Sequence, residues 1–165
     1  MKTLLGSIPE IKKTAARLIV GQCIETHLAE NRITALWQSF APRIKEVHHR
    51  LSTGSFSVQV YDHDFMKELF TPFTVFEKWA GVEVSIASDI PLNMKVLHIP
   101  AGRWAVFTYK GTANDFHVFA QYMYETWLPK SGEQLDDRPH FEQMPREYLG
   151  QGHPDAEEYV WIPIK

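Results

Sequence analysis

The sequence predicts an α+β fold in which two βαββ units pack about a pseudo-twofold axis, with antiparallel sheets and two main helices flanking a groove. Two observations carry this prediction. The amphipathic helical segment ITALWQSFAP (33–42) aligns without gaps with AQYMYETWLP (120–129), and the apolar segments before them, ARLIVGQ and GRWAVFT, also align. Each helix is then followed by two further strand-like segments.

The composition indicates a globular chain. Of its 165 residues, 44% are hydrophobic and 22% are charged, which is enough to bury a core without disulfides or a structural metal. We therefore expect one domain over residues 1–165, with half-repeats over 12–90 and 95–165. A net charge of −3 lacks the basic field that direct nucleic-acid binding needs.

The single cysteine, Cys23, excludes an internal disulfide and indicates a reducing compartment. The apolar burst near the N-terminus is too short for a signal peptide or a membrane span. The sequence therefore predicts a cytoplasmic protein without membrane contact.

In the first half, the apolar and β-branched stretch 12–27 is typical of a strand. Residues 33–47 place their apolar side chains on one helical face, with Asn31 as candidate N-cap and Pro42 as the residue that ends or kinks the helix. Alternation over 55–62 predicts a half-buried strand. A further strand is expected over 73–86, where Gly81 favours a bulge or a close approach of the backbone.

In the second half, a short strand and a Pro-Ala-Gly turn precede a strand over 103–109. The next helix has its apolar face at spacings of three and four from Phe116 to Trp127, with Asn114 or Asp115 as its cap, and is expected to stop at Pro129. Residues 139–144 and the C-terminal EEYVWIPIK are expected strands, joined by a polar loop.

Most motifs of catalysis and cofactor binding are absent. The chain lacks HExxH, CxxC, GxSxG, GxxxxGK and GxGxxG, so we expect neither a metal site nor a nucleotide cofactor. Asp62, His63 and Asp64 are adjacent, and neighbouring residues of a strand point to opposite faces, which makes them poor ligands to one metal.

Aromatic residues make up 13% of the chain, which indicates either a bulky core or an aromatic-lined cavity. The pseudo-twofold axis relates Trp37 and Phe40 of the first helix to Tyr124 and Trp127 of the second. We expect these four residues near the groove between the halves, where ligand sites are common.

Glu142 is the carboxylate of interest, because it lies within the aromatic-flanked strand HFEQM. Facing inward, it would be a charge that is costly to bury without a partner, and a ligand cation could supply that partner. Facing outward, it would be a solvated residue of an edge strand.

The blocks IPAGRWAVFTYKG, YMYETWLPKSG, PHFEQM and EEYVWIPIK together resemble the gyrase-inhibitor-like, or AraC-type effector-binding, domain family over nearly the whole chain. The resemblance implies a pocket between the halves that binds small, often cationic and amphipathic molecules. It places Glu142 at the position of the glutamate that contacts the cation. It also implies aromatic walls from Trp37, Trp104, Tyr124 and Trp127, to which Tyr61, Trp79 and Tyr109 are further candidates.

Many members of that family carry a DNA-binding helix-turn-helix domain, for which too few residues precede the first strand here, so the resemblance implies a stand-alone binding module of the kind found in mobile gene cassettes. Two alternatives stay open. One is a hydrolase of strained electrophilic molecules with Glu142 as general base and Tyr124 as proton donor. The other is an interaction protein that modulates a transcription or topoisomerase partner through the acidic segment 133–137.

Overall fold

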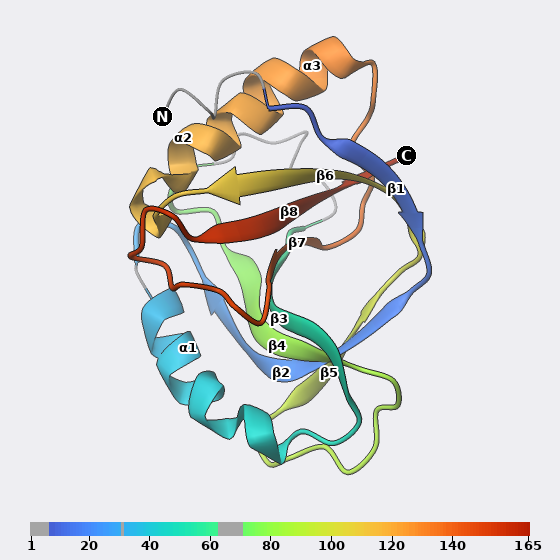
Figure 1. Cartoon of the computed structure of the whole chain (residues 1–165), viewed down its shortest axis with the longest axis vertical. Helices are drawn as coiled ribbons and strands as arrows, with labels where there is room; N and C mark the ends of the chain where they lie inside the picture. The colour runs from blue at the N-terminus through green and yellow to red at the C-terminus, as the bar shows by residue number, and fades with distance from the viewer. Residues whose placement is uncertain (1–6, 31, 63–70) are drawn as a thin grey trace.

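The computed structural model describes residues 7–30, 32–62 and 71–165 (Figure 1). Its strands are β1 (Glu10–Thr14), β2 (Arg17–Thr26), β3 (Arg50–Val60), β4 (Phe76–Val84), β5 (Lys95–Ile99), β6 (Gly102–Lys110), β7 (His140–Met144) and β8 (Glu157–Ile164). Its helical segments are α1 (Ile33–Phe40), η1 (Ala41–Glu46), η2 (Ala113–Asp115), α2 (Phe116–Gln121), η3 (Tyr122–Trp127) and α3 (Leu128–Ser131). Asn31, His63 and Asp64 lie outside the described residues, so the expected cap and acidic-histidine cluster are not described.

The predicted duplication is confirmed by the order of the elements. β2, α1, β3 and β4 form one βαββ unit, and β6, α2, β7 and β8 form the other. The strands make one antiparallel sheet in the order β1-β6-β8-β7-β3-β4-β2-β5. The two halves therefore merge through the pairing of β7 with β3, instead of packing as two separate sheets.

The sheet is strongly curled. β1 pairs with β6 at one edge, whereas β2 pairs with β4 and β5 near the other, although only Ala15 and Ala16 separate β1 from β2. This short link, and the Pro100–Ala101 link between β5 and β6, hold the two ends of the sheet near each other. Figure 1 shows the strands around an open ring, with α1 and the α2–α3 helix on its outside.

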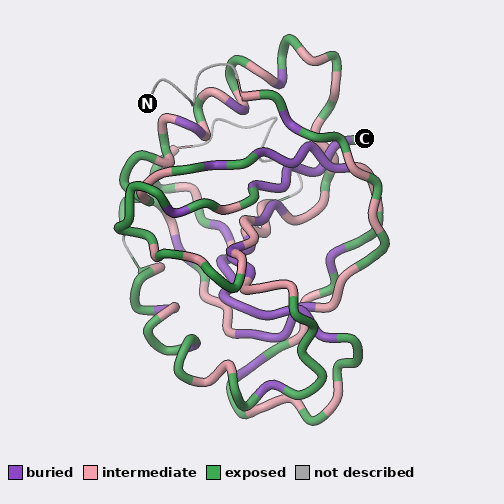
Figure 2. The backbone as a smooth tube through the Cα atoms, viewed as in Figure 1, coloured by how far each residue is buried: buried purple, intermediate pink, exposed green. Residues whose placement is uncertain are grey.

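Alternation along the strands divides the core between two faces. On the inner face, one cluster joins residues from both ends of the sheet, among them Ile19, Phe56, Trp104, Phe141 and Trp161. On the outer face, α1 covers a cluster of β2 and β4 residues, and α2 with η3 covers a cluster of β6 and β8 residues. Buried residues accordingly follow the strands in Figure 2, while most of the outward side of α1 is exposed.

Proline acts differently in the two helices. α1 ends at Phe40 and continues as a 3₁₀ segment through Pro42, as expected. The second helix does not stop at Pro129, which corrects the sequence-based expectation. A π-helical segment over Tyr122–Trp127 changes the hydrogen-bond register just before Pro129, which has no N–H to donate. The helix then ends at Ser131, and Gly132 caps it in the left-handed conformation with φ 79°. No helix within the described ranges is long and apolar enough to cross a bilayer.

Gly21 and Gly81 lie opposite each other where β2 and β4 come very close. A Cβ atom added at Gly21 would lie 2.0 Å from the Ala80 carbonyl oxygen and 2.6 Å from the Gly81 Cα. The close approach expected at Gly81 is thus confirmed, whereas the register shift lies in β3 between Arg50 and Ser55. Because neither glycine has a side chain, the backbones of β2 and β4 can lie unusually close together where the sheet curls.

We predict that Gly21→Ala lowers the free energy of unfolding by about 2 kcal/mol or more, because the added methyl group meets backbone atoms that cannot rotate away. Urea denaturation followed by circular dichroism measures this change. Gly152→Ala is the matched control, since a Cβ there meets nothing within 4 Å. Equal denaturation midpoints for the two variants would contradict the close approach of the β2 and β4 backbones.

Candidate ligand-binding site

Four polar side chains from the four central strands meet on the outer face between the helices. They are Gln59 of β3, Lys78 of β4, Glu142 of β7 and Glu158 of β8. Their placement follows from strand alternation: Lys78 shares a face with Ala80 and Val82, and Glu158 shares one with Val160 and Ile162. We call these four residues the charged floor.

Glu142 lies on the outer face of the sheet and contacts two polar side chains. Its Oε1 accepts a hydrogen bond of 2.9 Å from Gln59 Nε2 and lies 3.8 Å from Lys78 Nζ. The side chains of Lys78 and Glu142 are only 4% and 13% exposed. A pair this buried is held by its mutual attraction, and removing one member leaves the other charge uncompensated.

Glu158 is the second carboxyl group of the floor. Burial, and next the charge of Glu142, raise the pKa of Glu158 to about 8, which Lys78 and a hydrogen bond from Tyr148 oppose. Burial lowers the pKa of Lys78, against the attraction of both carboxylates. The floor therefore holds two carboxyl groups for one ammonium group, in a setting that favours retention of a proton.

Two tyrosines and a histidine lie beside the floor. The Tyr124 hydroxyl and His140 Nδ1 are joined by a hydrogen bond of 2.7 Å, and the rings of Tyr61 and His140 meet edge to face at 5.0 Å. Burial, with a smaller contribution from Arg138, lowers the pKa of His140 to about 3, so the imidazole is neutral at physiological pH. Burial also raises the pKa of both phenols. Tyr61, Tyr124 and His140 thus form an aromatic wall beside the floor that is polar but uncharged.

A cavity of about 540 Å³ opens beside α1. It is lined by α1 and η1 on one side and by the β7–β8 connection on the other, through Thr34, Trp37, Gln38, Ala41, Pro42, Ser55, Met144, Tyr148, Gly150 and Gln151. Met144 shares a face of β7 with Glu142, and Tyr148 lies close enough to Glu158 to influence its pKa. This cavity is widely open to solvent and lies next to the charged floor, although none of the four floor residues lines it.

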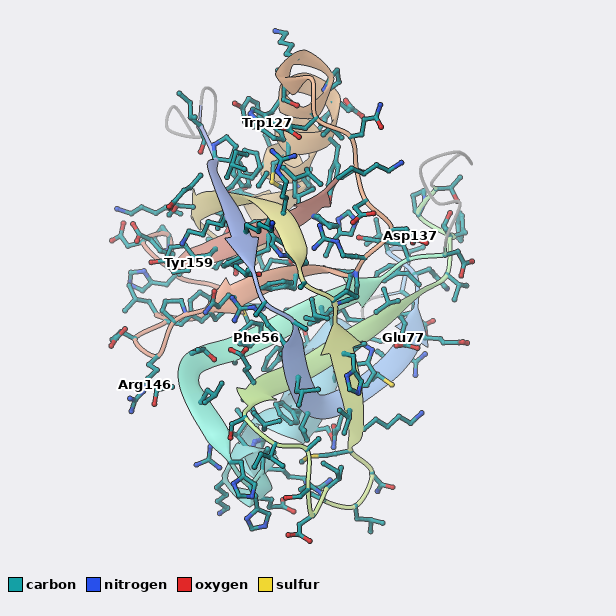
Figure 3. The ribbon with its side chains drawn as sticks, turned by 90° about the vertical axis from the view of Figure 1, so that its right-hand side faces the viewer. Phe56, Glu77, Trp127, Asp137, Arg146 and Tyr159 are labelled. Atoms are coloured by element: carbon teal, nitrogen blue, oxygen red, sulfur yellow. The ribbon has the colours of Figure 1, made fainter. Side chains whose placement is uncertain are left out.

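The structure gathers only part of the expected aromatic set at this groove. Tyr61 and Tyr124 flank the floor, and Trp37 lines the cavity. Phe40 is completely buried beneath α1, and Trp127 packs edge-on to Phe107 in the cluster under the second helix (Trp127 labelled in Figure 3).

The other three expected aromatics lie elsewhere. Trp79 and Trp104 belong to the inner-face cluster, because strand alternation turns them away from the helices. Tyr109 is buried in the core, and its hydroxyl donates to the Thr112 carbonyl oxygen at 2.5 Å. In the acidic segment 133–137, Glu133 pairs with Arg103 and Asp136 with Arg138.

Reasoning from the sequence missed Lys78, Glu158, Gln59, Tyr148 and His140. The alternation in FEKWAGVEV and EEYVWIPI carried a signal for two of them, since Lys78 and Glu158 fall in phase with buried aliphatic residues. Tyr148 lies in an irregular connection and had no such signal. Within the described residues, no three histidine, cysteine or acidic side chains are placed to hold a metal ion.

Comparison with known proteins identifies the family of this chain. The family described as the GyrI-like small molecule binding domain matches residues 8–165. The transcriptional regulator BrlR of Pseudomonas aeruginosa is 29% identical over 132 residues, which are 80% of this chain but 46% of BrlR. The chain thus matches less than half the length of that regulator.

Two solved structures share the fold. SAV2435 bound to tetraphenylphosphonium has a TM-score of 0.71 at 14% identity, covering 95% of this chain and 93% of that one. The EcmrR C-terminal domain has a TM-score of 0.68 at 11% identity, covering 98% and 99%. With the family match over nearly its whole length, this chain belongs to the GyrI-like small-molecule-binding domain family.

Proposed function

We propose that this domain binds small amphipathic molecules carrying a positive charge, in the groove between α1 and the second helix. The observation that carries the proposal is the charged floor, in which two partly buried carboxyl groups accompany one buried lysine beside neutral tyrosines. Glu142 and Glu158 would face the ligand's charge, while Trp37, Tyr61, Tyr124 and Tyr148 would contact its apolar part.

Electrostatics supports a cation as the ligand. A unit charge 4 Å from a carboxylate gains about 4 kcal/mol at an effective dielectric constant of about 20. Lys78 already offsets one of the two carboxyl groups, so the floor can accept one further positive charge. The Gln59 Oε1 atom is buried and has no hydrogen-bond partner among the described residues, which leaves an acceptor next to the carboxylates.

The aromatic wall supports broad selection by shape. Stacking of a cation on tyrosine or tryptophan contributes about 0.5–2 kcal/mol per ring and tolerates many ligand shapes. A structural neighbour bound to tetraphenylphosphonium, a bulky cation with four aromatic rings, agrees with a site of this kind. Because the domain is also similar to part of a transcriptional regulator, we propose that ligand occupancy is its regulatory signal to a partner.

We predict that Glu142→Gln weakens tetraphenylphosphonium binding about tenfold or more, while binding of neutral triphenylphosphine oxide changes less than about twofold. The amide keeps the size of the side chain but removes its charge, so Lys78 would then neutralise Glu158. Isothermal titration calorimetry measures both affinities. Glu125→Gln is the control, because Glu125 is an exposed carboxylate on the second helix. Equal losses for both ligands would contradict a charge-selective site.

We predict that Trp37→Leu weakens the binding of the cation and of the neutral oxide by similar factors, about three- to tenfold. The change removes aromatic area from the cavity without altering any charge. Titration of each ligand against the variant tests this, with Tyr159→Leu on the inner face as the control. Unchanged affinity for both ligands would place them away from the α1 cavity.

A further inference from the structure

We propose that Lys78 is a resident counter-ion for Glu142, and that Glu158 holds a proton which leaves when a ligand cation enters the groove. This inference rests on the proposed function and deepens it, because it identifies the two residues that set which ligand charge is accepted. The domain would then exchange one proton for one positive charge.

The two carboxyl groups differ in their polar neighbours. Glu142 lies between the Gln59 amide, which donates at 2.9 Å, and the Lys78 ammonium group at 3.8 Å. Glu158 lies on the same outer face of β8, two residues from Val160, which pairs with Glu142, and its neighbour Tyr148 carries no charge. Lys78 therefore forms its ion pair with Glu142. Glu158 is left without a cationic partner of its own and is the carboxyl group better able to hold a proton.

The groups that surround Glu158 agree with this assignment. Glu142 acts on it from β7, Lys78 from β4, Tyr148 from the β7–β8 connection and Tyr109 from β6. Both tyrosines are neutral at physiological pH, because burial raises the pKa of Tyr109 to about 12 and raises that of Tyr148 further. Lys78 is the one cation among these groups, and its contact is with Glu142.

The protonation of Glu158 makes the affinity for a cation depend on pH. With its pKa raised to about 8, Glu158 is mostly protonated at pH 7 and ionised above pH 9. A cation beside the carboxyl group favours the ionised form, so binding expels the proton. Cation affinity should therefore rise with pH up to about pH 8 and level off above it, whereas the affinity of a neutral ligand should not change.

Calorimetric titration with tetraphenylphosphonium in buffers of different ionisation enthalpy measures the proton count. We expect release of most of one proton per cation at pH 7, and much less at pH 9. Below pH 7, cation affinity should rise close to tenfold per pH unit. Triphenylphosphine oxide should release no proton at either pH.

Three variants separate the roles of the residues. Glu158→Gln should abolish proton release and flatten the pH profile of cation binding, with neutral-ligand affinity retained. Lys78→Met should strengthen cation binding about tenfold, because it removes the competing ammonium group. Glu157→Gln, on the exposed neighbour in β8, should behave as the native protein. Thermal melts and binding of the neutral oxide report whether each variant is folded.

Cation binding with less than about 0.2 proton released at pH 7 would overturn this inference and leave the proposed function standing. Unchanged proton release in Glu158→Gln, or weaker cation binding in Lys78→Met, would also overturn it. A carbon-13 NMR pH titration of glutamate carboxyl groups tests the unliganded protein. One group titrating between about pH 7 and 9, and missing in Glu158→Gln, supports the proposal. Titration of every carboxyl group below about pH 6 contradicts it, whether or not any ligand binds.

Discussion

The antiparallel pairing of β3 with β7 is the contact on which the rest of this structure depends. It joins two βαββ units into one sheet and places Ser57 opposite Glu142 at the junction. Because β4 and β8 flank this pair, Lys78 and Glu158 are brought beside Glu142 on the outer face. Each half contributes a helix to one side of this face, so the polar residues lie where neither helix covers them with apolar side chains.

The inner face of the sheet forms a packed core, whereas the outer face carries the charged floor between its two helix-covered clusters. The inner face is a core in which the Arg17 guanidinium group lies 5.0 Å from the centre of the Trp161 ring and pairs with Glu83 at 2.9 Å. The short links between β1 and β2 and between β5 and β6, together with the close approach of Gly21 and Gly81, maintain the curl of the sheet. Figure 3 shows Phe56 within this interior, well away from Trp127 on the second helix. A rigid inner core can hold strained or costly groups, such as buried charges, at fixed positions on the outer face.

Much of the fold could be predicted because it depends on local periodicity. The matching helical segments and the alternating strands are properties of short windows, and they identified the duplication, whereas for Glu142 they left both orientations open. β1 comes from the first half and pairs with β6 of the second, whereas β5 comes from the second half and pairs with β2 of the first. This exchange could not be predicted, since pairing between distant strands leaves little trace in one sequence. The π-helical segment before Pro129 and the continuation of the helix past this proline were also missed, because a proline in a helical pattern ordinarily marks an end.

The site was predicted less completely than the fold. Periodicity indicated that Glu142 could face a groove, but only the strand order showed that Lys78 and Glu158 come from strands on either side of it. The symmetry argument placed Phe40 and Trp127 near the groove, whereas both are used for packing beneath their helices. Trp79 and Trp104 were candidates through the family resemblance, and their strand phase assigns them to the inner core.

The central claim is that a cationic ligand binds over the charged floor on the outer face. A crystal structure of the protein with bound tetraphenylphosphonium tests it most directly. The account predicts the phosphonium between α1 and the second helix, with its phenyl rings against Trp37 and Tyr124 and its charge beside Glu142 and Glu158. A phosphonium seated instead on the inner face, in the cavity lined by Val106, Tyr159 and Trp161, would contradict the claim.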